Sequence, residues 1–124
     1  MAAKHKSGST QNELVQCDLE FPAFQQQLAD MESAAFDALL KKIETINKMT
    51  WNQIYATSSK GKEKRGLNWE VLPDQKTASG VPIASIRITD KFRIRVMRDG
   101  VFMRCISLHP DHDSAYKAQG NEDI

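Results

Sequence analysis

The sequence lacks several features that would assign it to a common functional class. No stretch is apolar for long enough to span a bilayer, and residues 1–10 contain no apolar run, so we expect neither a membrane anchor nor a signal peptide. Glycine-rich phosphate loops and the nucleophile motif Gly-x-Ser-x-Gly are absent. The sequence therefore argues against a membrane protein, a nucleotide-binding enzyme with those loops and a hydrolase with that motif.

The sequence also has few cysteines and almost no net charge. The two cysteines, Cys17 and Cys105, fall at inward-facing strand positions, where we expect reduced thiols in a cytoplasmic protein rather than a disulfide. Seventeen basic and sixteen acidic residues leave a formal charge of +1, which indicates no particular partner. Between positions 60 and 104, however, eleven basic residues stand against five acidic ones. Such asymmetry within one chain is typical of a nucleic-acid-binding surface.

The chain of 124 residues is long enough for one hydrophobic core. Residues 1–11 are polar and aperiodic, so we expect a disordered N-terminal arm there. Residues 12–117 then form a single domain, and residues 118–124 form a polar tail.

The N-terminal half of the domain predicts a strand followed by helices. Apolar residues alternate over residues 15–21, which predicts the first strand. Pro22 suits the first turn of a helix, and Ser33 is a candidate cap for a second helix. The apolar stripe of that second helix comprises Phe36, Leu39, Leu40, Ile43 and Ile46. Thr50 and Gln53 have the spacing of a capping box, which predicts a short third helix carrying Trp51, Ile54 and Tyr55.

Residues 67–82 follow a basic segment, and their sequence indicates secondary structure less clearly than the rest of the domain. The residues around Trp69 and Val71 form a short strand or a patch at the sheet edge. Residues 73–82 are rich in serine, glycine and proline and are expected to form a loop.

Residues 83–116 predict a meander of three antiparallel strands. The breaks fall at Thr89-Asp90-Lys91 and at Asp99-Gly100, and Asp-Gly is a strong hairpin signal. A three-residue loop at the first break pairs Ile86 with Ile94 and Arg87 with Arg93. With Asp99-Gly100 as the second turn, the pairs are Val96 with Met103, Arg95 with Arg104 and Arg93 with Ile106.

These registers separate an apolar face of the sheet from an arginine-rich face. The apolar face carries Phe92, Ile94, Val96, Met103 and Cys105, and the other carries Arg87, Arg93, Arg95 and Arg104 among Met97, Phe102 and Ile106. Directly opposed like charges destabilise a sheet by a few tenths to about 1 kcal/mol per pair. A cluster of this kind favours binding of a polyanion. The structural alternative is a solvated face on which each arginine pairs with a carboxylate.

Two histidines follow the last strand, in the segment His109-Pro-Asp-His112-Asp-Ser-Ala-Tyr116. Histidine is the side chain most easily poised for proton transfer near neutral pH. Strand parity would place His109 on the apolar face, although Pro110 allows the chain to turn there. The alternatives are a surface loop anchored by Tyr116, or a metal site that also uses Asp111 and Asp113. The ligand spacing matches no standard zinc site, so we expect no metal.

The order of strand, two helices, basic segment and meander resembles the RelE/ParE superfamily of small bacterial toxins over residues 13–117. The shared pattern is the arginine-rich strand after a short loop, the turn, the last strand with a polar loop, and the tyrosine beyond it. The resemblance implies an α+β fold in which two N-terminal helices pack on one face of a mainly antiparallel, about four-stranded sheet. The opposite face would be concave and basic.

The resemblance also implies a function, the toxin of a type II toxin–antitoxin system. RelE-like members cleave mRNA on the ribosome without a metal or other cofactor, and a cognate antitoxin protein inhibits them. By position, the catalytic candidates are Arg87, Arg93, Tyr116 and either His109 or His112, of which we favour His112 because it can swing over the arginine face. The candidate RNA-binding residues are Lys60, Lys62, Lys64 and Arg65 in the basic segment, together with Arg95 and Arg104.

Some features depart from the superfamily pattern. The chain has an extra N-terminal arm and the 73–82 segment, and it carries histidines where some members have arginine or lysine. The ParE-like branch shares the fold but inhibits DNA gyrase, which is one alternative function. A non-catalytic RNA- or protein-binding module that uses the arginine face alone is another.

Overall fold

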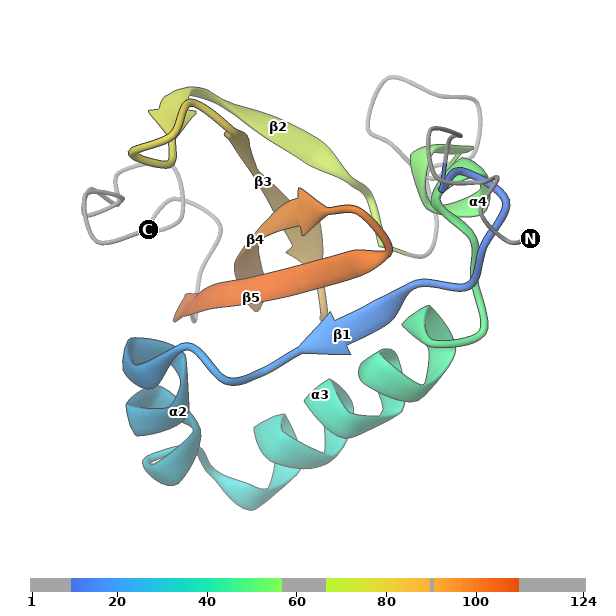
Figure 1. Cartoon of the computed structure of the whole chain (residues 1–124). Helices are drawn as coiled ribbons and strands as arrows, with labels where there is room; N and C mark the ends of the chain where they lie inside the picture. The colour runs from blue at the N-terminus through green and yellow to red at the C-terminus, as the bar shows by residue number, and fades with distance from the viewer. Residues whose placement is uncertain (1–9, 57–66, 90, 110–124) are drawn as a thin grey trace.

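The computed structural model describes residues 10–56, 67–89 and 91–109. The elements are β1 (Gln16–Asp18), α2 (Pro22–Ala29), α3 (Ser33–Ile46), α4 (Trp51–Ala56), β2 (Glu70–Lys76), β3 (Pro82–Arg87), β4 (Arg93–Asp99) and β5 (Phe102–His109). The strands form a five-stranded sheet in the order β1-β5-β4-β3-β2, in which β1 runs parallel to β5 and the other pairs are antiparallel. Helices α2 and α3 lie on one side, next to β1 and β5 (Figure 1). No helix within the described ranges is long and apolar enough to cross a membrane.

The α+β class is therefore confirmed, but the expected count of about four strands is wrong. The fifth strand is β2, which begins where a short strand or an edge patch was expected around Trp69 and Val71 and runs as far as Lys76 through the segment expected to be a loop. Pro73 is tolerated because β2 forms an edge of the sheet, where a missing N–H breaks no ladder hydrogen bond. Asp74 has a φ of 62°, and the register with β3 shifts between Val71 and Lys76. The strand is thus irregular, which explains why its residues do not alternate clearly in the sequence.

The helices match the sequence in part. Pro22 begins α2 as expected, but the N-cap of α3 is Glu32, which makes no side-chain capping bond, so the assignment of Ser33 as cap is wrong. Leu39 and Ile46 are buried, whereas Phe36 is 37% and Leu40 is 42% exposed. The buried stripe of α3 is therefore narrower than predicted, because only one side of this helix meets the core.

The capping box at α4 is confirmed. The Thr50 Oγ1 accepts from the Gln53 N–H at 3.2 Å, and the Gln53 Oε1 accepts from the Thr50 N–H at 2.9 Å. These reciprocal bonds satisfy amide groups that the first helical turn leaves open. They orient α4 so that Trp51 and Ile54 are fully buried.

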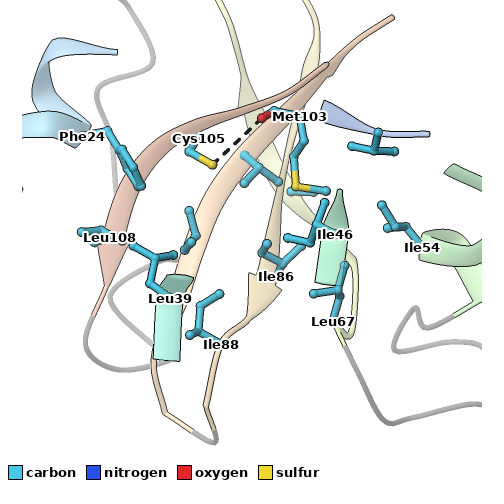
Figure 2. Close-up of a cluster of buried hydrophobic side chains, with 14 of the residues drawn as sticks. Phe24, Leu39, Ile46, Ile54, Leu67, Ile86, Ile88, Met103, Cys105 and Leu108 are labelled. Atoms are coloured by element: carbon cyan, nitrogen blue, oxygen red, sulfur yellow. Dashed lines mark hydrogen bonds between the residues drawn. The ribbon is translucent and has the colours of Figure 1, made fainter. Parts of the chain in front are cut away.

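The main core lies between the helices and one face of the sheet (Figure 2). Phe24, Leu39, Ile46 and Ile54 come from the helices, and Ile86, Ile94, Val96, Met103, Cys105 and Leu108 come from the strands. Phe92 packs against this cluster. The apolar face predicted for the meander is thus confirmed. A smaller cluster of Leu72, Ile83, Met97 and Ile106 is also buried.

The first hairpin of the meander has the predicted register, with Ile86 opposite Ile94 and Arg87 opposite Arg93. The second hairpin does not. Asp99 pairs with Phe102, so the turn residues are Gly100 and Val101 rather than Asp99 and Gly100. Gly100 has a φ of 61°, and a glycine with positive φ at the first turn position is typical of a type II′ turn. Each residue of β4 near the turn therefore pairs with a β5 residue two positions further along than predicted. Because side chains alternate with a period of two, this shift leaves every side chain on its predicted face.

A bulge in β5 corrects the placement of His109. Val96 pairs with Cys105, but the preceding residue, Arg95, pairs with Ser107, so Ile106 is an extra residue in β5. An extra residue reverses which face the following side chains occupy. His109 therefore lies opposite Arg93 on the arginine face and not on the apolar face that strict parity predicts. The predicted pairs of Val96 with Met103, Arg95 with Arg104 and Arg93 with Ile106 are wrong, because the turn shifts every partner in β5 by two positions and the bulge shifts the partners of Arg95 and Arg93 by one more.

Candidate functional site

Two rows of polar residues cross the sheet on the face opposite the main core. In the first row, Arg87 of β3, Arg93 of β4 and His109 of β5 are successive cross-strand partners. In the second row, Arg95 of β4 lies between Ser85 of β3 and Ser107 of β5. We call the five residues Arg87, Arg93, Arg95, Ser107 and His109 the arginine–histidine cluster.

A chain of hydrogen bonds joins β2, β4 and β5 within this site. The Arg95 Nε donates to the Gln75 Oε1 at 2.9 Å, and the Arg95 Nη1 donates to the Ser107 Oγ at 3.2 Å. The Ser107 Oγ lies 2.7 Å from the His109 Nε2. Gln75 thereby holds Arg95, Arg95 holds Ser107, and Ser107 holds the imidazole ring.

Two of the three arginines of β4, Arg93 and Arg95, are buried, whereas the sequence suggests an exposed charge for Arg93. Arg93 is 8% exposed and Arg95 is 2% exposed. The Arg93 Nη1 donates to the Thr89 carbonyl at 3.4 Å, at the turn between β3 and β4. The arginine face is consequently an enclosed polar site in its centre rather than an open basic surface. Arg87, at the end of β3, is half-buried.

Helix α3 adds a further cation near Arg87. Partial burial and the charge of Arg87 lower the pKa of the Lys42 ammonium. The charges of Arg87 and Lys42 together create a local positive potential, which an anionic ligand would relieve. Sequence reasoning missed Lys42 because this lysine belongs to a helix that packs on the other face of the sheet.

Arg104 lies on the same face but outside the cluster, opposite Met97. Its guanidinium forms ion pairs with Asp18 and, at 2.8 Å, with Asp99. The hydrogen bond with Asp99 and the charges of both carboxylates raise the pKa of Arg104. In this structure the charge of Arg104 is balanced by carboxylates, as in the solvated-face alternative.

The remaining candidate residues lie outside the part of the chain that the structure describes. The basic segment with Lys60, Lys62, Lys64 and Arg65 lies outside the described residues, and so do His112 and Tyr116. Asp111 and Asp113, which the metal alternative would need, lie outside them as well.

Sequence reasoning missed Gln75 and Ser107. Gln75 falls in the segment expected to be a loop, and without the bulge Ser107 would face the apolar core. The available signal is the polar character of Ser107 itself, since a serine between Ile106 and Leu108 contradicts a continuous apolar face.

The cluster combines groups that are useful at a phosphate. Guanidinium groups stabilise charge that develops on phosphate oxygens, and an imidazole held by one ring nitrogen can transfer protons with the other. The arrangement can therefore support acid–base chemistry on a phosphodiester or the binding of an anion. No family model, curated protein or solved structure matches the chain.

Proposed function

We propose that the protein is a metal-independent endoribonuclease that cleaves mRNA on the ribosome, as the toxin of a type II toxin–antitoxin pair. The observation that carries this proposal is the position of His109, which shares a row with Arg93 and Arg87. A proton-transfer group beside two cations is what cleavage of a phosphodiester requires. The resemblance to RelE-like toxins supplies the choice of mRNA and of the ribosome.

The proposed reaction is attack of a ribose 2′-oxygen on the adjacent phosphorus. A base accepts the 2′-OH proton while the O2′–P bond forms, the P–O5′ bond then breaks, and an acid protonates the departing 5′-oxygen. We assign the proton transfer to His109 in place of His112, because His109 lies on the arginine face next to Arg93. Arg93 and Arg87 stabilise the negative charge of the phosphorane. Arg93 must become accessible when RNA binds, since it is only 8% exposed.

The proposal includes a protein partner and a cytoplasmic location, where ribosomes and mRNA are found. A phosphate-binding site would bind cellular RNA whenever the partner is absent, so we expect an acidic or amphipathic antitoxin that covers the arginine face. Co-expression from the native locus followed by affinity purification of the tagged protein tests this. Recovery of the protein alone, together with harmless expression in its host, would contradict the partner.

The nuclease activity is tested in a translating extract supplied with a defined mRNA. We expect cleavage that yields 2′,3′-cyclic phosphate and 5′-hydroxyl ends, and no cleavage where a 2′-deoxynucleotide replaces the attacked ribose. His109→Ala should lower the single-turnover rate by about 10² to 10⁴, the usual contribution of a positioned acid or base. His112→Ala is the matched control and should have a smaller effect. A larger effect for His112→Ala, or parent rates for both variants, would refute the assignment of His109.

The burial of Arg93 and Arg95 favours a second candidate, a non-catalytic binding module whose arginines support the sheet. The same extract distinguishes it, because a binding module leaves mRNA intact. Intact mRNA together with inhibited DNA gyrase would instead indicate the ParE-like activity.

A further inference from the structure

We propose that Ser107 is a positioning residue that holds the Nε2 of His109 inside the protein, and that Arg95 and Gln75 in turn position Ser107. This inference rests on the proposed function, because it explains how His109 could act as base and acid in one reaction. It also changes the role of Arg95 from a candidate RNA contact to a support for the histidine.

Burial makes Arg95 suitable for this role. With 2% of its surface exposed, Arg95 offers almost nothing to RNA in this structure, and Gln75 is only 8% exposed. A buried guanidinium that donates to two fixed oxygens has little freedom to rotate. The position of the Ser107 hydroxyl is therefore set by three strands of the sheet and not by a loop.

The hydrogen bond from Arg95 limits which further hydrogen bonds the Ser107 hydroxyl can form. A guanidinium only donates hydrogen bonds, so the Ser107 Oγ accepts from Arg95 and keeps a second lone pair for another donor. We assign that donor to the Nε2–H of His109, whose nitrogen lies 2.7 Å away. The Nε2 then stays protonated while the Nδ1 gains a proton as base and loses it as acid. The contact with Ser107 persists in both states, so the ring need not reorient between the two proton transfers.

The bulge at Ile106 is the local feature that makes this contact possible. Without the extra residue, Ser107 and His109 would point toward the main core. With it, both side chains lie on the arginine face, two residues apart on one strand. Residues at i and i+2 of a strand share a face, which allows the direct hydrogen bond.

The test combines nitrogen-15 NMR of the histidine ring with single-turnover cleavage. We expect the parent protein to show a slowly exchanging Nε2–H signal for His109 and Nδ1 as the titrating nitrogen. Ser107→Ala should remove the slow signal and lower the cleavage rate constant by about 100-fold, as expected for a reacting group displaced by roughly 1 Å, with little change in KM. Ser107→Thr keeps the hydroxyl and should restore both the signal and the rate.

Ser85→Ala is the matched control, because Ser85 flanks Arg95 in the same row on the opposite side from Ser107. It should leave the His109 signal and the rate unchanged. Gln75→Leu should weaken the signal and the rate less than Ser107→Ala does, since Arg95 keeps its bond to Ser107. An Nδ1–H tautomer in the parent protein, or a His109 signal that Ser107→Ala does not alter, would overturn the inference. A parent protein that leaves mRNA intact would overturn the proposed function, while the NMR result still decides whether Ser107 holds His109.

Discussion

At the scale of single residues, burial decides what each arginine contributes. Arg93 and Arg98 belong to the same strand. Arg93 lies in the arginine–histidine cluster, whereas Arg98 contacts the aromatic rings of Trp51 and Tyr55 in α4. An arginine contributes both a charge and a packed hydrocarbon stem, so separating the two effects at one position requires two different substitutions.

Arg93→Ala and Arg93→Met separate these two effects at the proposed site. Truncation to alanine removes a buried hydrocarbon stem, so we expect it to lower the free energy of unfolding by about 2 kcal/mol. Methionine keeps most of that stem and removes the positive charge facing Arg87. We therefore expect Arg93→Met to change the free energy of unfolding by less than about 1 kcal/mol. Both variants should lose RNA cleavage. Urea denaturation and the cleavage assay measure these effects, and parent-level cleavage by folded Arg93→Met would show that the charge is not catalytic.

The raised pKa of the Cys105 thiol predicts that the protein becomes less stable as the pH rises into the alkaline range. The hydrogen bond with Cys17 and burial raise the pKa of the Cys105 thiol well above its ordinary value. Above about pH 8.5, the usual pKa of an unfolded cysteine, the unfolded chain has lost this proton while the folded chain retains it. The free energy of unfolding must then fall as pH rises, by at most about 1.4 kcal/mol per pH unit between the two pKa values.

The measurement is urea denaturation from about pH 7 to about pH 10, compared with Cys105→Val. Valine is also small and apolar but has no proton to lose, and the remaining titratable groups are common to both proteins. The stability difference between parent and variant should shift in favour of the variant as pH rises. A difference that does not change with pH would contradict the raised pKa.

At the scale of the elements, α2 protects the edge of β5. β1 pairs with β5 over residues 102–104, and among the described residues no strand pairs with the rest of this edge of β5. The Gln27 Nε2 donates to the Leu108 carbonyl at 3.0 Å, and the Gln27 Oε1 accepts from the Leu108 N–H at 2.8 Å. One side-chain amide thus satisfies both backbone groups of Leu108, as a neighbouring strand would.

Gln27→Glu tests this edge contact. A carboxylate still accepts from the Leu108 N–H but cannot donate to the Leu108 carbonyl, so we expect a loss of about 1–3 kcal/mol in the free energy of unfolding. Gln25→Glu is the matched control on an exposed position of the same helix and should stay within about 0.5 kcal/mol of the parent. Equal stability of the two variants in urea denaturation would show that the amide does not support β5.

At the scale of the whole molecule, Arg98 connects segments that are far apart in the chain. Its Nη1 donates to the Tyr55 hydroxyl at 2.7 Å and to the Gln11 side-chain oxygen at 2.5 Å, and its Nη2 donates to the Thr10 hydroxyl at 2.7 Å. The guanidinium also lies 4.7 Å from the centre of the Trp51 ring. Thr10 and Gln11, assigned from sequence to the polar arm, are thereby attached to the domain.

Arg98→Ala should therefore destabilise the protein by about 2–4 kcal/mol, because it removes several charge-assisted hydrogen bonds and a stacked cation together. Arg104→Ala is the control, since Arg104 also binds through two nitrogens but its side chain is 43% exposed in both of its ion pairs. Such pairs contribute about 0–1 kcal/mol. Thermal and urea denaturation of both variants measure the difference, and a cost for Arg104→Ala equal to that of Arg98→Ala would contradict the role assigned to Arg98.

Local patterns in the sequence were sufficient for several of these features. The capping box of Thr50 and Gln53 and the first hairpin depend on residues close together in the chain, so their spacing predicted them correctly. The apolar face of β4 and β5 followed from the two-residue period of a strand, which an error of two positions in the turn does not disturb. In contrast, the continuation of β2 from Pro73 to Lys76 was not predicted, since Pro73 and Asp74 are acceptable only at an irregular sheet edge.

The sequence by itself determined the class of the fold, the helices that carry the core, and the gathering of Arg87, Arg93 and Arg95 on one face of the sheet. Only the tertiary structure decided that Arg93 and Arg95 are buried, that Gln75 reaches Arg95, and that His109 lies beside Arg93. The physical reason is that a bulge and a pairing register belong to two strands at once. One extra residue at Ile106 reverses the faces of Ser107 and His109, and nothing in the β5 sequence alone specifies which residue of β4 lies opposite.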